Sequence, residues 1–394
     1  MSDFTYKTIC ILGRQPALGL AELERLYGAD HVKPTQYGAL LDIDAAEVNF
    51  KRLGGTIKVA RILNVLPTLA WPELLKYLED TIPEHLQYLP EGKFTLGLSV
   101  YGLNVGLQTL NRDLLRLKKV IKATGKPVRI IPNKTLELNS AQVLHNKLTH
   151  RGAWELSFIK DGQQTILAQT MFVQDIEAYA ARDQARPKRD PRVGMLPPKL
   201  AQIIINLATG PEQSGRLLDP FCGTGVILQE AMLMGYSVIG TDIEPRMVEY
   251  TKENLRWLVQ RNPGIQALAV VEVGDATSHK WPPFAHVASE IYLGRPLNSL
   301  PPPDKTRAIV NDVNTITRKF LENLSGQMKS GRYACLAVPA WRKPDGTFIQ
   351  LPVIDRLTDM GYNQLDLKHV RSSDLLYFRE GQVVARQLII LEKV

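Results

Sequence analysis

The sequence is poor in cysteine, with three in 394 residues, and these lie far apart at Cys10, Cys222 and Cys335. No Cys-x-x-Cys pair and no cysteine and histidine cluster with zinc-like spacing occurs, so neither a disulfide framework nor a metal site is indicated. Long apolar runs are also absent, since none approaches the roughly 20 residues that span a bilayer. The N-terminus lacks the charged start and apolar core of a secretory signal. We therefore expect a cytoplasmic protein with no metal and no membrane partner.

The charge is unbalanced in favour of bases, with 48 Lys and Arg against 40 Asp and Glu. A net charge of +8 favours a polyanionic partner, provided that the basic residues are clustered. Two clusters occur, one in a predicted helix over residues 108–124 and one in the connector that follows residue 176. Each could be an ordinary solvated surface, but two dense patches in one chain favour phosphate binding. The candidate RNA-binding residues are Arg112, Arg116, Lys119 and Lys122 in the helix, and Arg186, Lys188 and Arg189 in the connector.

Hydrophobic periodicity and proline positions divide the chain into four parts. Residues 1–60 are predicted to form an N-terminal α+β unit, and residues 61–175 a second α+β domain. Residues 176–200 form a polar, basic, proline-containing connector, which is the natural domain boundary. From residue 201 to residue 394 strands alternate with helices, as a doubly wound α/β sheet requires. The predicted strands include 7–13, 38–43, 94–101 and 165–173, and the predicted helices include 17–26, 71–79, 108–124 and 139–148.

The heptapeptide Asp219-Pro-Phe-Cys-Gly-Thr-Gly225 lies between an apolar run and a helix-like segment. Gly223 and Gly225 stand where a strand passes into a helix N-terminus, and glycine there permits positive φ and close approach of a ligand. The carboxylate of Asp219, at the strand end, can bind an ammonium group. This pattern predicts a loop that binds S-adenosylmethionine.

Two further acids follow at the ends of predicted strands. Asp242 ends a short β-like run about one βα unit after Asp219, where a carboxylate can accept both ribose hydroxyls. Asp275 ends a third run, where it can accept a hydrogen bond from the adenine amino group. A nicotinamide cofactor is less well supported, because Gly-x-Gly-x-x-Gly is absent and position 228 is Leu228. The predicted cofactor-binding residues are Asp219, Phe221, Gly223, Gly225, Asp242, Asp275 and Ala276.

Several segments together resemble one family, the class I methyltransferases that carry an N-terminal THUMP RNA-binding domain and methylate N2 of a guanosine in tRNA. The residues that carry the resemblance are Arg186–Asp190, Gly194–Ala201, the loop at 219–225, Gly240–Asp242 and Leu138–Val143. The resemblance implies a Rossmann-like methyltransferase domain, preceded by a ferredoxin-like unit and a THUMP-like domain. It also implies S-adenosylmethionine as cofactor, tRNA as partner and the guanosine at position 10 as the target.

The chain departs from this family in the catalytic loop. An exocyclic amine is a poor nucleophile, and the family uses an Asp-Pro-Pro-Tyr type loop whose polar groups accept the amine hydrogens while the aromatic ring stacks on the base. Here the corresponding residues are Ser289-Glu-Ile-Tyr292-Leu293, without either proline. One register places Glu290 in the acceptor position and Leu293 in the aromatic position. The other places Ser289 as the acceptor and Tyr292 as the stacking ring, and spacing alone leaves both open.

The sequence therefore predicts an S-adenosylmethionine-dependent tRNA guanine-N2 methyltransferase whose candidate catalytic residues are Ser289, Glu290 and Tyr292. One alternative is an RNA-binding protein that retains the cofactor pocket without transferring methyl groups, or that needs an activating partner subunit. A DNA amino-methyltransferase is a further alternative, because such enzymes use the same loop chemistry.

Overall fold

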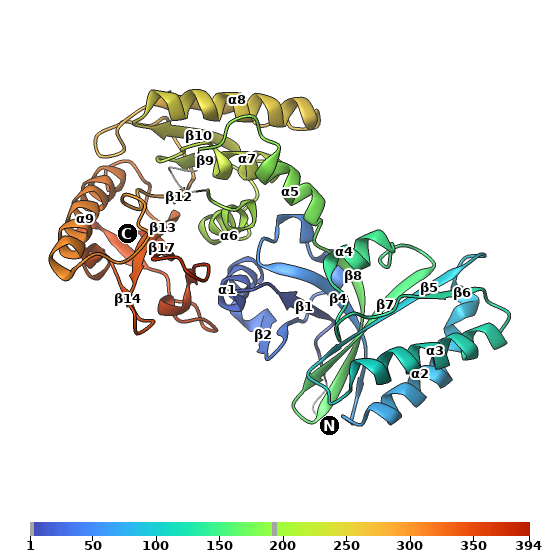
Figure 1. Cartoon of the computed structure of the whole chain (residues 1–394). Helices are drawn as coiled ribbons and strands as arrows, with labels where there is room; N and C mark the ends of the chain where they lie inside the picture. Colours follow the sequence, from blue (N-terminus) through green and yellow to red (C-terminus); the bar gives the residue numbers. More distant parts are fainter. Residues whose placement is uncertain (1–3, 191–194) are drawn as a thin grey trace. The chain divides into compact units, whose positions relative to one another are not determined.

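The computed structural model describes residues 4–190 and 195–394, and contacts divide the chain into two compact units. The first unit contains residues 1–14, 30–51 and 56–177, and the second contains residues 15–29, 52–55 and 178–394 (Figure 1). This division differs from the expected boundaries. The expected break after residue 60 falls inside strand β4 (Thr56–Leu66), and the segments on either side of it share one sheet.

The first unit is built on an eight-stranded sheet with the order β2-β3-β1-β4-β8-β7-β5-β6. Long antiparallel pairings of β4 with β8 and of β8 with β7 form its centre, whereas β5 runs parallel to β6 and β7. The strands other than β4 are β1 (Thr8–Leu12), β2 (Val32–Thr35), β3 (Gly38–Leu41), β5 (Phe94–Tyr101), β6 (Val128–Ile130), β7 (Ala153–Asp161) and β8 (Gln164–Val173).

Helices α2 (Trp71–His85) and α3 (Leu107–Ala123) of the first unit share one hydrophobic cluster with its sheet. Helix α3 buries Leu110, Leu114, Leu117 and Ile121 completely, which is the spacing of one helix face. The basic residues on its other face remain exposed, as the periodicity predicts. Helix α4 (Ser140–His145) is shorter than expected and begins at a capping box formed by Asn139 and Gln142.

The second unit contains a nine-stranded sheet in which β11, β10, β9, β12, β13, β17 and β15 lie side by side in that order. Strands β9 to β13 run parallel, and β17 is antiparallel to β13. The strands are β9 (Arg216–Asp219), β10 (Ser237–Asp242), β11 (Ala269–Val273), β12 (His286–Glu290), β13 (Tyr333–Arg342), β15 (Tyr362–Gln364) and β17 (Val384–Lys393), with β14 (Phe348–Ile349) beside β13 and β16 (Leu376–Tyr377) beside β17. The doubly wound α/β sheet is confirmed, with its topological switch between β9 and β12.

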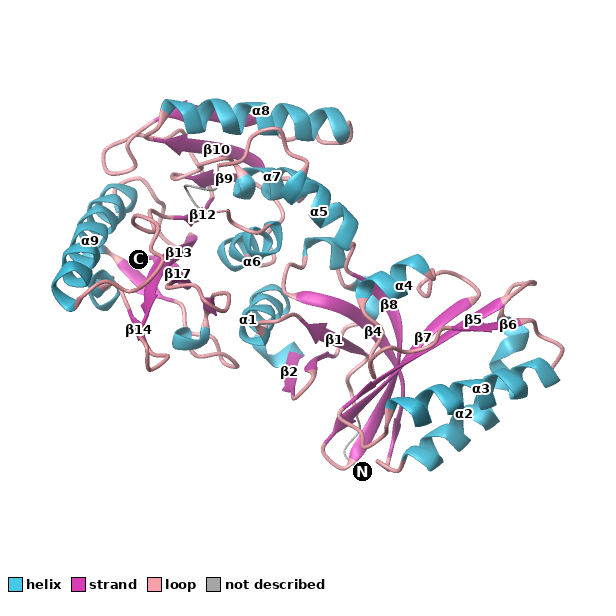
Figure 2. Ribbon diagram, in the orientation of Figure 1, coloured by secondary structure: helices cyan, strands magenta, loops and turns pink. Residues whose placement is uncertain are grey.

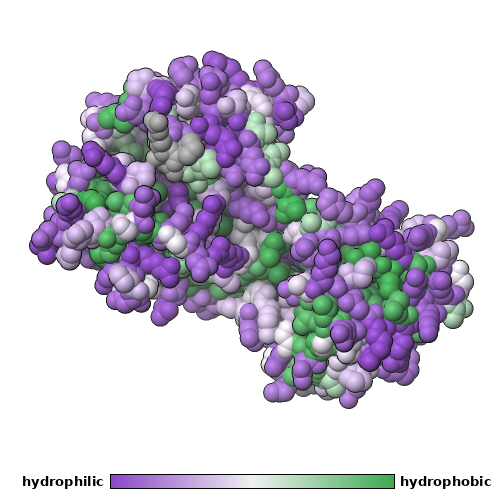
Figure 3. All heavy atoms as spheres, viewed as in Figure 1, coloured by the Kyte–Doolittle hydropathy of each residue, from purple (hydrophilic) through white to green (hydrophobic). Residues whose placement is uncertain are grey.

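Alternate residues of these strands enter two separate hydrophobic clusters on opposite faces of the sheet. Leu217 packs in one cluster and Leu218 in the other, as the two-residue period of a strand requires. Helices on the first face are α1 (Pro16–Tyr27), α6 (Pro198–Thr209), α7 (Val226–Leu233) and α8 (Pro245–Arg261), and α9 (Pro303–Ser325) covers the other (Figure 2). Helix α8 exposes a hydrophilic outer surface (Figure 3).

The connector contains more regular structure than its composition predicts. Residues Ile176–Gln184 form helix α5, and residues 191–194, within the expected connector at 176–200, lie outside the described residues. Within the described residues, every helix is too short or too polar to cross a membrane.

Candidate functional site

The loop after β9 is held in a conformation that requires glycine. Gly223 has φ of 50° and Gly225 has φ of 81°, both in the left-handed region, and α7 begins directly after Gly225. A Cβ atom on Gly225 would lie 2.8 Å from Thr251 Cγ2, whereas one on Gly223 would meet none of the residues at 4–190 and 195–394 within 4 Å. Thr251 Oγ1 donates a hydrogen bond of 2.8 Å to the Gly223 carbonyl. Packing on α8 therefore fixes the loop, and the described residues leave the Gly223 side open.

Asp219, the last residue of β9, is almost completely buried, with 2% exposure. Its Oδ1 accepts hydrogen bonds from Ser289 Oγ at 2.6 Å and from the Phe221 backbone N–H at 3.3 Å. Burial is the largest cause that raises the pKa of Asp219 to about 7, and the nearby carboxylates of Asp242 and Glu290 contribute to this rise, whereas the hydrogen bonds from Ser289 and Phe221 oppose it. A cationic ligand would therefore stabilise the ionised form of Asp219.

Asp242 lies at the end of the adjacent strand and is oriented by two backbone groups. Its Oδ2 accepts from the Gly223 N–H and its Oδ1 from the Glu244 N–H, each at 2.9 Å. Each carboxylate oxygen has a further lone pair, so the side chain can still accept two ligand hydroxyls. Partial burial raises the pKa of Asp242 above its ordinary value. The structure thus brings Asp219, Gly223 and Asp242 together.

The third acid predicted to bind the cofactor, Asp275, makes hydrogen bonds within its own turn. Asp275 is exposed, and its Oδ1 accepts hydrogen bonds from Thr277 N at 2.9 Å and Thr277 Oγ1 at 2.8 Å. It therefore caps the turn after β11, and the adjacent Ala276 is buried. Phe221 packs edge-on against Phe320 of α9, with ring centroids 5.0 Å apart.

The candidate catalytic residues occupy different environments at the end of β12. Ser289 is fully buried and its hydroxyl donates to Asp219, so it faces the cofactor loop. Glu290 is the last residue of β12, and its Oε1 accepts a hydrogen bond from Arg386 Nε of β17. Tyr292 lies in the following loop, with 37% of its surface exposed. Strand β12 ends at Glu290, which favours the register that places Glu290 rather than Ser289 in the acceptor position.

The predicted phosphate-binding residues of α3 are exposed, but two of them already form ion pairs with acidic side chains. Arg116 forms a two-pronged pair with Glu79 of α2, at 2.7 and 2.8 Å, and Arg112 contacts Asp113. Lys119 and Lys122 are exposed.

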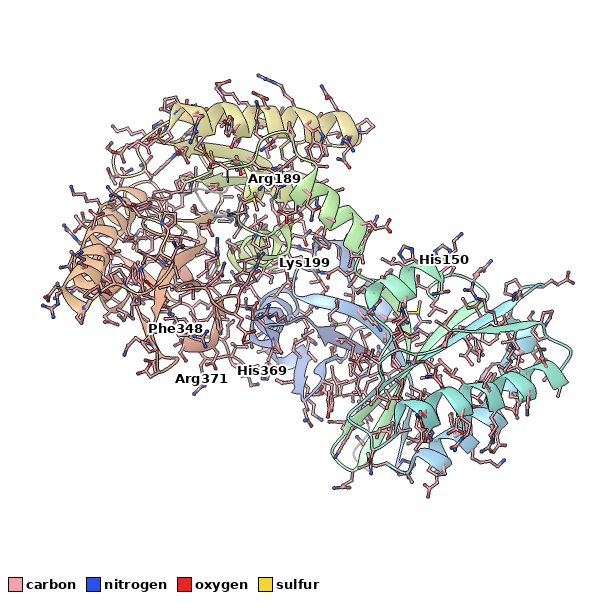
Figure 4. All side chains as sticks on the ribbon, in the orientation of Figure 1. His150, Arg189, Lys199, Phe348, His369 and Arg371 are labelled. Carbon is pink, nitrogen blue, oxygen red and sulfur yellow. The ribbon has the colours of Figure 1, made fainter. Side chains whose placement is uncertain are left out.

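The connector is packed against the cofactor loop. Asn254 of α8 accepts from the Lys188 N–H and donates to the carbonyls of Lys188 and Thr224. Arg186 is only 3% exposed, which differs from the expectation of a phosphate ligand, and burial lowers the pKa of its guanidinium. Arg189 is exposed (Figure 4). The Lys188 ammonium lies 3.3 Å from Glu253.

Arg386 is the site residue that the sequence did not reveal. It lies 96 residues after Glu290, in a strand with no motif, and only the antiparallel pairing of β17 with β13 brings it to this edge of the sheet. Across residues 4–190 and 195–394, no group of three or more His, Cys, Asp or Glu side chains could hold a metal ion.

Comparisons with known proteins find similarity to methyltransferases. A family model described as DNA methylase (N6_N4_Mtase) matches residues 133–253. The tRNA (guanine(10)-N2)-dimethyltransferase of Methanothermobacter thermautotrophicus is 34% identical over 163 residues, covering 40% of this chain and 43% of that protein. The protein of the same name from Pyrococcus abyssi is 28% identical over 307 residues, covering 71% of this chain and 87% of that protein. The chain is similar in sequence to these methyltransferases over the lengths given.

The fold is shown by TrmN from Thermus thermophilus, which aligns over 99% of both chains with a TM-score of 0.52 and 18% identity. The Rossmann-like methyltransferase fold is therefore confirmed. The match to the first relative spans 43% of that protein's length, which is less than half.

Proposed function

We propose that this protein transfers the methyl group of S-adenosylmethionine to the exocyclic N2 of a guanosine in tRNA, the guanosine at position 10. One observation carries the proposal: Asp219, Asp242 and Glu290 converge at the ends of three neighbouring strands, around a loop fixed by two left-handed glycines. The names of the relatives from Methanothermobacter and Pyrococcus support tRNA guanine as the substrate.

The residues at this edge fit the cofactor. Within the part of the chain that the structure describes, both hydrogen bonds to Asp219 fall on Oδ1, so Oδ2 remains for the methionine ammonium. Asp242 is held by two backbone N–H groups with its remaining lone pairs available for the ribose hydroxyls. When bound, S-adenosylmethionine supplies an electrophilic methyl group.

The acceptor side of the reaction is assigned to the end of β12. Glu290 uses Oε1 for Arg386, and its Oε2 can accept a hydrogen bond from the guanine amine. This contact orients the amine lone pair toward the methyl group, and orientation of this kind can supply a large part of a rate enhancement. With Glu290 in the acceptor position, Leu293 has the place of the family's aromatic residue and offers no ring. We therefore assign stacking on the target base to the neighbouring Tyr292, which is 37% exposed.

The test is to incubate the purified protein with S-adenosylmethionine and an unmodified tRNA transcript, and to identify the methylated nucleosides by mass spectrometry. N2-methylguanosine is expected, and Glu290→Ala and Tyr292→Ala should each reduce its formation while cofactor affinity is retained. Glu249→Ala, on the surface of α8, is the control, because this exposed carboxylate pairs only with Lys252 among the described ion pairs. A product lost in neither variant would remove Glu290 and Tyr292 from the mechanism.

An activity on DNA amines is the second candidate, because the matching family model is described as DNA methylase. The same assay with duplex DNA separates the two substrates. Cofactor binding without any product would instead support an RNA-binding protein or a missing partner subunit.

We further propose that the first unit is a THUMP-like module and that the basic face of α3 binds tRNA phosphates. Lys119→Ala combined with Lys122→Ala should weaken tRNA binding and reduce its salt dependence, measured as the slope of log Kd against log salt. Lys76→Ala, which removes a lysine paired with Asp80 in α2, is the matched control. An unchanged slope would mean that the phosphates lie elsewhere.

A further inference from the structure

Glu290 is paired with an arginine that has no counterpart in the loop motif. Arg386 Nε donates to Glu290 Oε1, and the two side chains are only 7% and 14% exposed. In the sheet, Glu290 is opposite Ala337 of β13, and Arg386 is opposite Pro339 of the same strand. Strand β17 is antiparallel to β13, so the beginning of β17 lies at the edge where the parallel strands end. Arg386 is therefore at the edge that carries Asp219 and Asp242.

We infer that Arg386 is the positioning residue of the methyl-transfer reaction: it holds the Glu290 carboxylate in the orientation that accepts the target amine. This inference rests on the proposed function. It assigns to Arg386 the constraint that the missing prolines would otherwise provide.

The catalytic loop of this chain has two sources of freedom that need such a constraint. Glutamate has one more rotatable bond than aspartate, and ordering a side chain of this length costs conformational entropy. Ile291 and Tyr292 stand where two prolines would fix the backbone φ angles. An arginine fixes a carboxylate well because its planar guanidinium offers several N–H donors in a rigid array. Nε occupies one carboxylate oxygen and leaves the other for the substrate.

The charges at this edge give Arg386 a second effect. Asp219, Asp242 and Glu290 place three carboxyl groups close together, and both neighbours contribute to the raised pKa of Asp219. A buried guanidinium against Glu290 offsets part of this repulsion. Without Arg386, a buried Glu290 carboxylate would lose its counterion and would turn toward water, away from the position that meets the amine.

The experiment measures kcat and KM for tRNA and for S-adenosylmethionine in Arg386→Ala, Arg386→Lys, Glu290→Ala and the double variant Glu290→Ala/Arg386→Ala. In Arg386→Ala we expect kcat to fall about a hundredfold with both KM values nearly unchanged, since a misplaced group slows the chemical step. Arg386→Lys should retain an intermediate kcat. Guanidinium ion added to the assay should restore part of the kcat of Arg386→Ala, but none in Glu290→Ala.

The double variant tests whether Arg386 acts through Glu290. Because Arg386 acts through Glu290, the double variant should be no slower than Glu290→Ala alone, whereas losses that multiply would overturn the assignment. Arg332→Ala is the matched control, because Arg332 pairs with Glu212 before the beginning of β13, at the other end of this strand. It should leave kcat unchanged.

The remaining outcomes distinguish a failure of the Arg386 assignment from a failure of the proposed function. A wild-type protein that makes N2-methylguanosine, with an Arg386→Ala variant that is equally fast, overturns the inference alone. An Arg386→Ala variant that folds, has a lower Tm and keeps the wild-type kcat also overturns the inference, since the pair would then have only a structural role. A wild-type protein that transfers no methyl group to tRNA overturns the inference together with the proposed function. Should Arg386→Ala fail to fold, Arg386→Lys replaces it in the test. A reduced kcat with unchanged KM values in Arg386→Lys supports the inference, and a wild-type kcat overturns it.

Discussion

At the scale of single residues, the two glycines of the loop after β9 have similar backbone angles and different surroundings. Gly225 would place a Cβ atom 2.8 Å from Thr251 Cγ2, and Gly223 would place one where no described residue lies within 4 Å. Gly223→Ala should therefore cost only the left-handed conformation, roughly 1 to 2 kcal/mol. Gly225→Ala adds a steric clash, so its Tm should fall further and its cofactor affinity should be lost, as thermal unfolding and calorimetry can measure. Equal losses of stability in the two variants would show that Thr251 moves aside without cost.

Asp219 predicts a pH-dependent affinity for the cofactor. Burial raises its pKa to about 7, so much of the free protein carries a neutral carboxyl group below that pH. The neutral form contributes to stability at low pH, and this contribution is lost as pH rises through about 7. Binding of a cationic ammonium requires the ionised form, so affinity for S-adenosylmethionine should rise up to tenfold per pH unit between about pH 5.5 and 7, then level off. Asp219→Asn should bind weakly with little pH dependence, and a parallel pH response in this variant would assign the titration to another group.

The sequence predicted part of this site because its members follow strands that are consecutive along the chain. Asp219 and Asp242 each end an apolar run, and parallel strands bring such ends together. Arg386 could not be found in this way, because it lies 96 residues after Glu290 and only the pairing of β17 with β13 brings the two together. Asp275 shows that the pattern is also ambiguous, since an acid at a strand end can accept hydrogen bonds within its own turn.

At the scale of elements, helix α1 has a function in the fold that its amphipathic pattern does not reveal. Glu22 is fully buried, and its carboxylate accepts from the backbone N–H groups of Gly54 and Gly55 at 2.9 Å and from Asn206 Nδ2 of α6 at 2.7 Å. The periodicity predicted a helix at residues 17–26 and was right. It gave no reason to place this helix with the second unit, because the partners of Glu22 lie far along the chain.

Removal of this carboxylate should destabilise the second unit. Glu22→Ala leaves three buried donors without an acceptor, which we expect to cost about 3 kcal/mol or more in the free energy of unfolding. Glu22→Gln retains one oxygen acceptor and should cost less. Chemical denaturation followed by tryptophan fluorescence measures both, with Glu47→Ala on an exposed surface as the control. A Glu22→Ala variant as stable as the control would mean that water replaces the carboxylate without penalty.

At the scale of the whole molecule, the path of the chain links the two units at more than one place. It passes from one unit to the other after residues 14, 29, 51, 55 and 177. The composition of the connector predicted only the last of these passages, because a proline-containing polar segment is visible in the sequence, whereas a helix exchanged between units is not. The second unit is thus assembled from three separate pieces of the chain, including α1 and residues 52–55.

A fragment that begins at the connector should therefore be defective, although the sequence suggests a clean boundary there. Residues 178–394 alone lack Leu18 and Ala21, which pack in the hydrophobic cluster of α6, and they lack Arg52, whose Nε donates to Asn206 Oδ1 at 2.8 Å. We expect this fragment to be insoluble or to unfold at a lower temperature than the second unit of the full chain.

The full chain cleaved by a protease at a site inserted between residues 177 and 178 is the matched control, because it retains α1 and residues 52–55. Its two fragments should remain associated in size-exclusion chromatography, since the N-terminal fragment supplies core residues of the second unit. A fragment 178–394 with the Tm of the uncleaved protein, together with fragments that separate after cleavage, would show that the two units are independent at the connector after all.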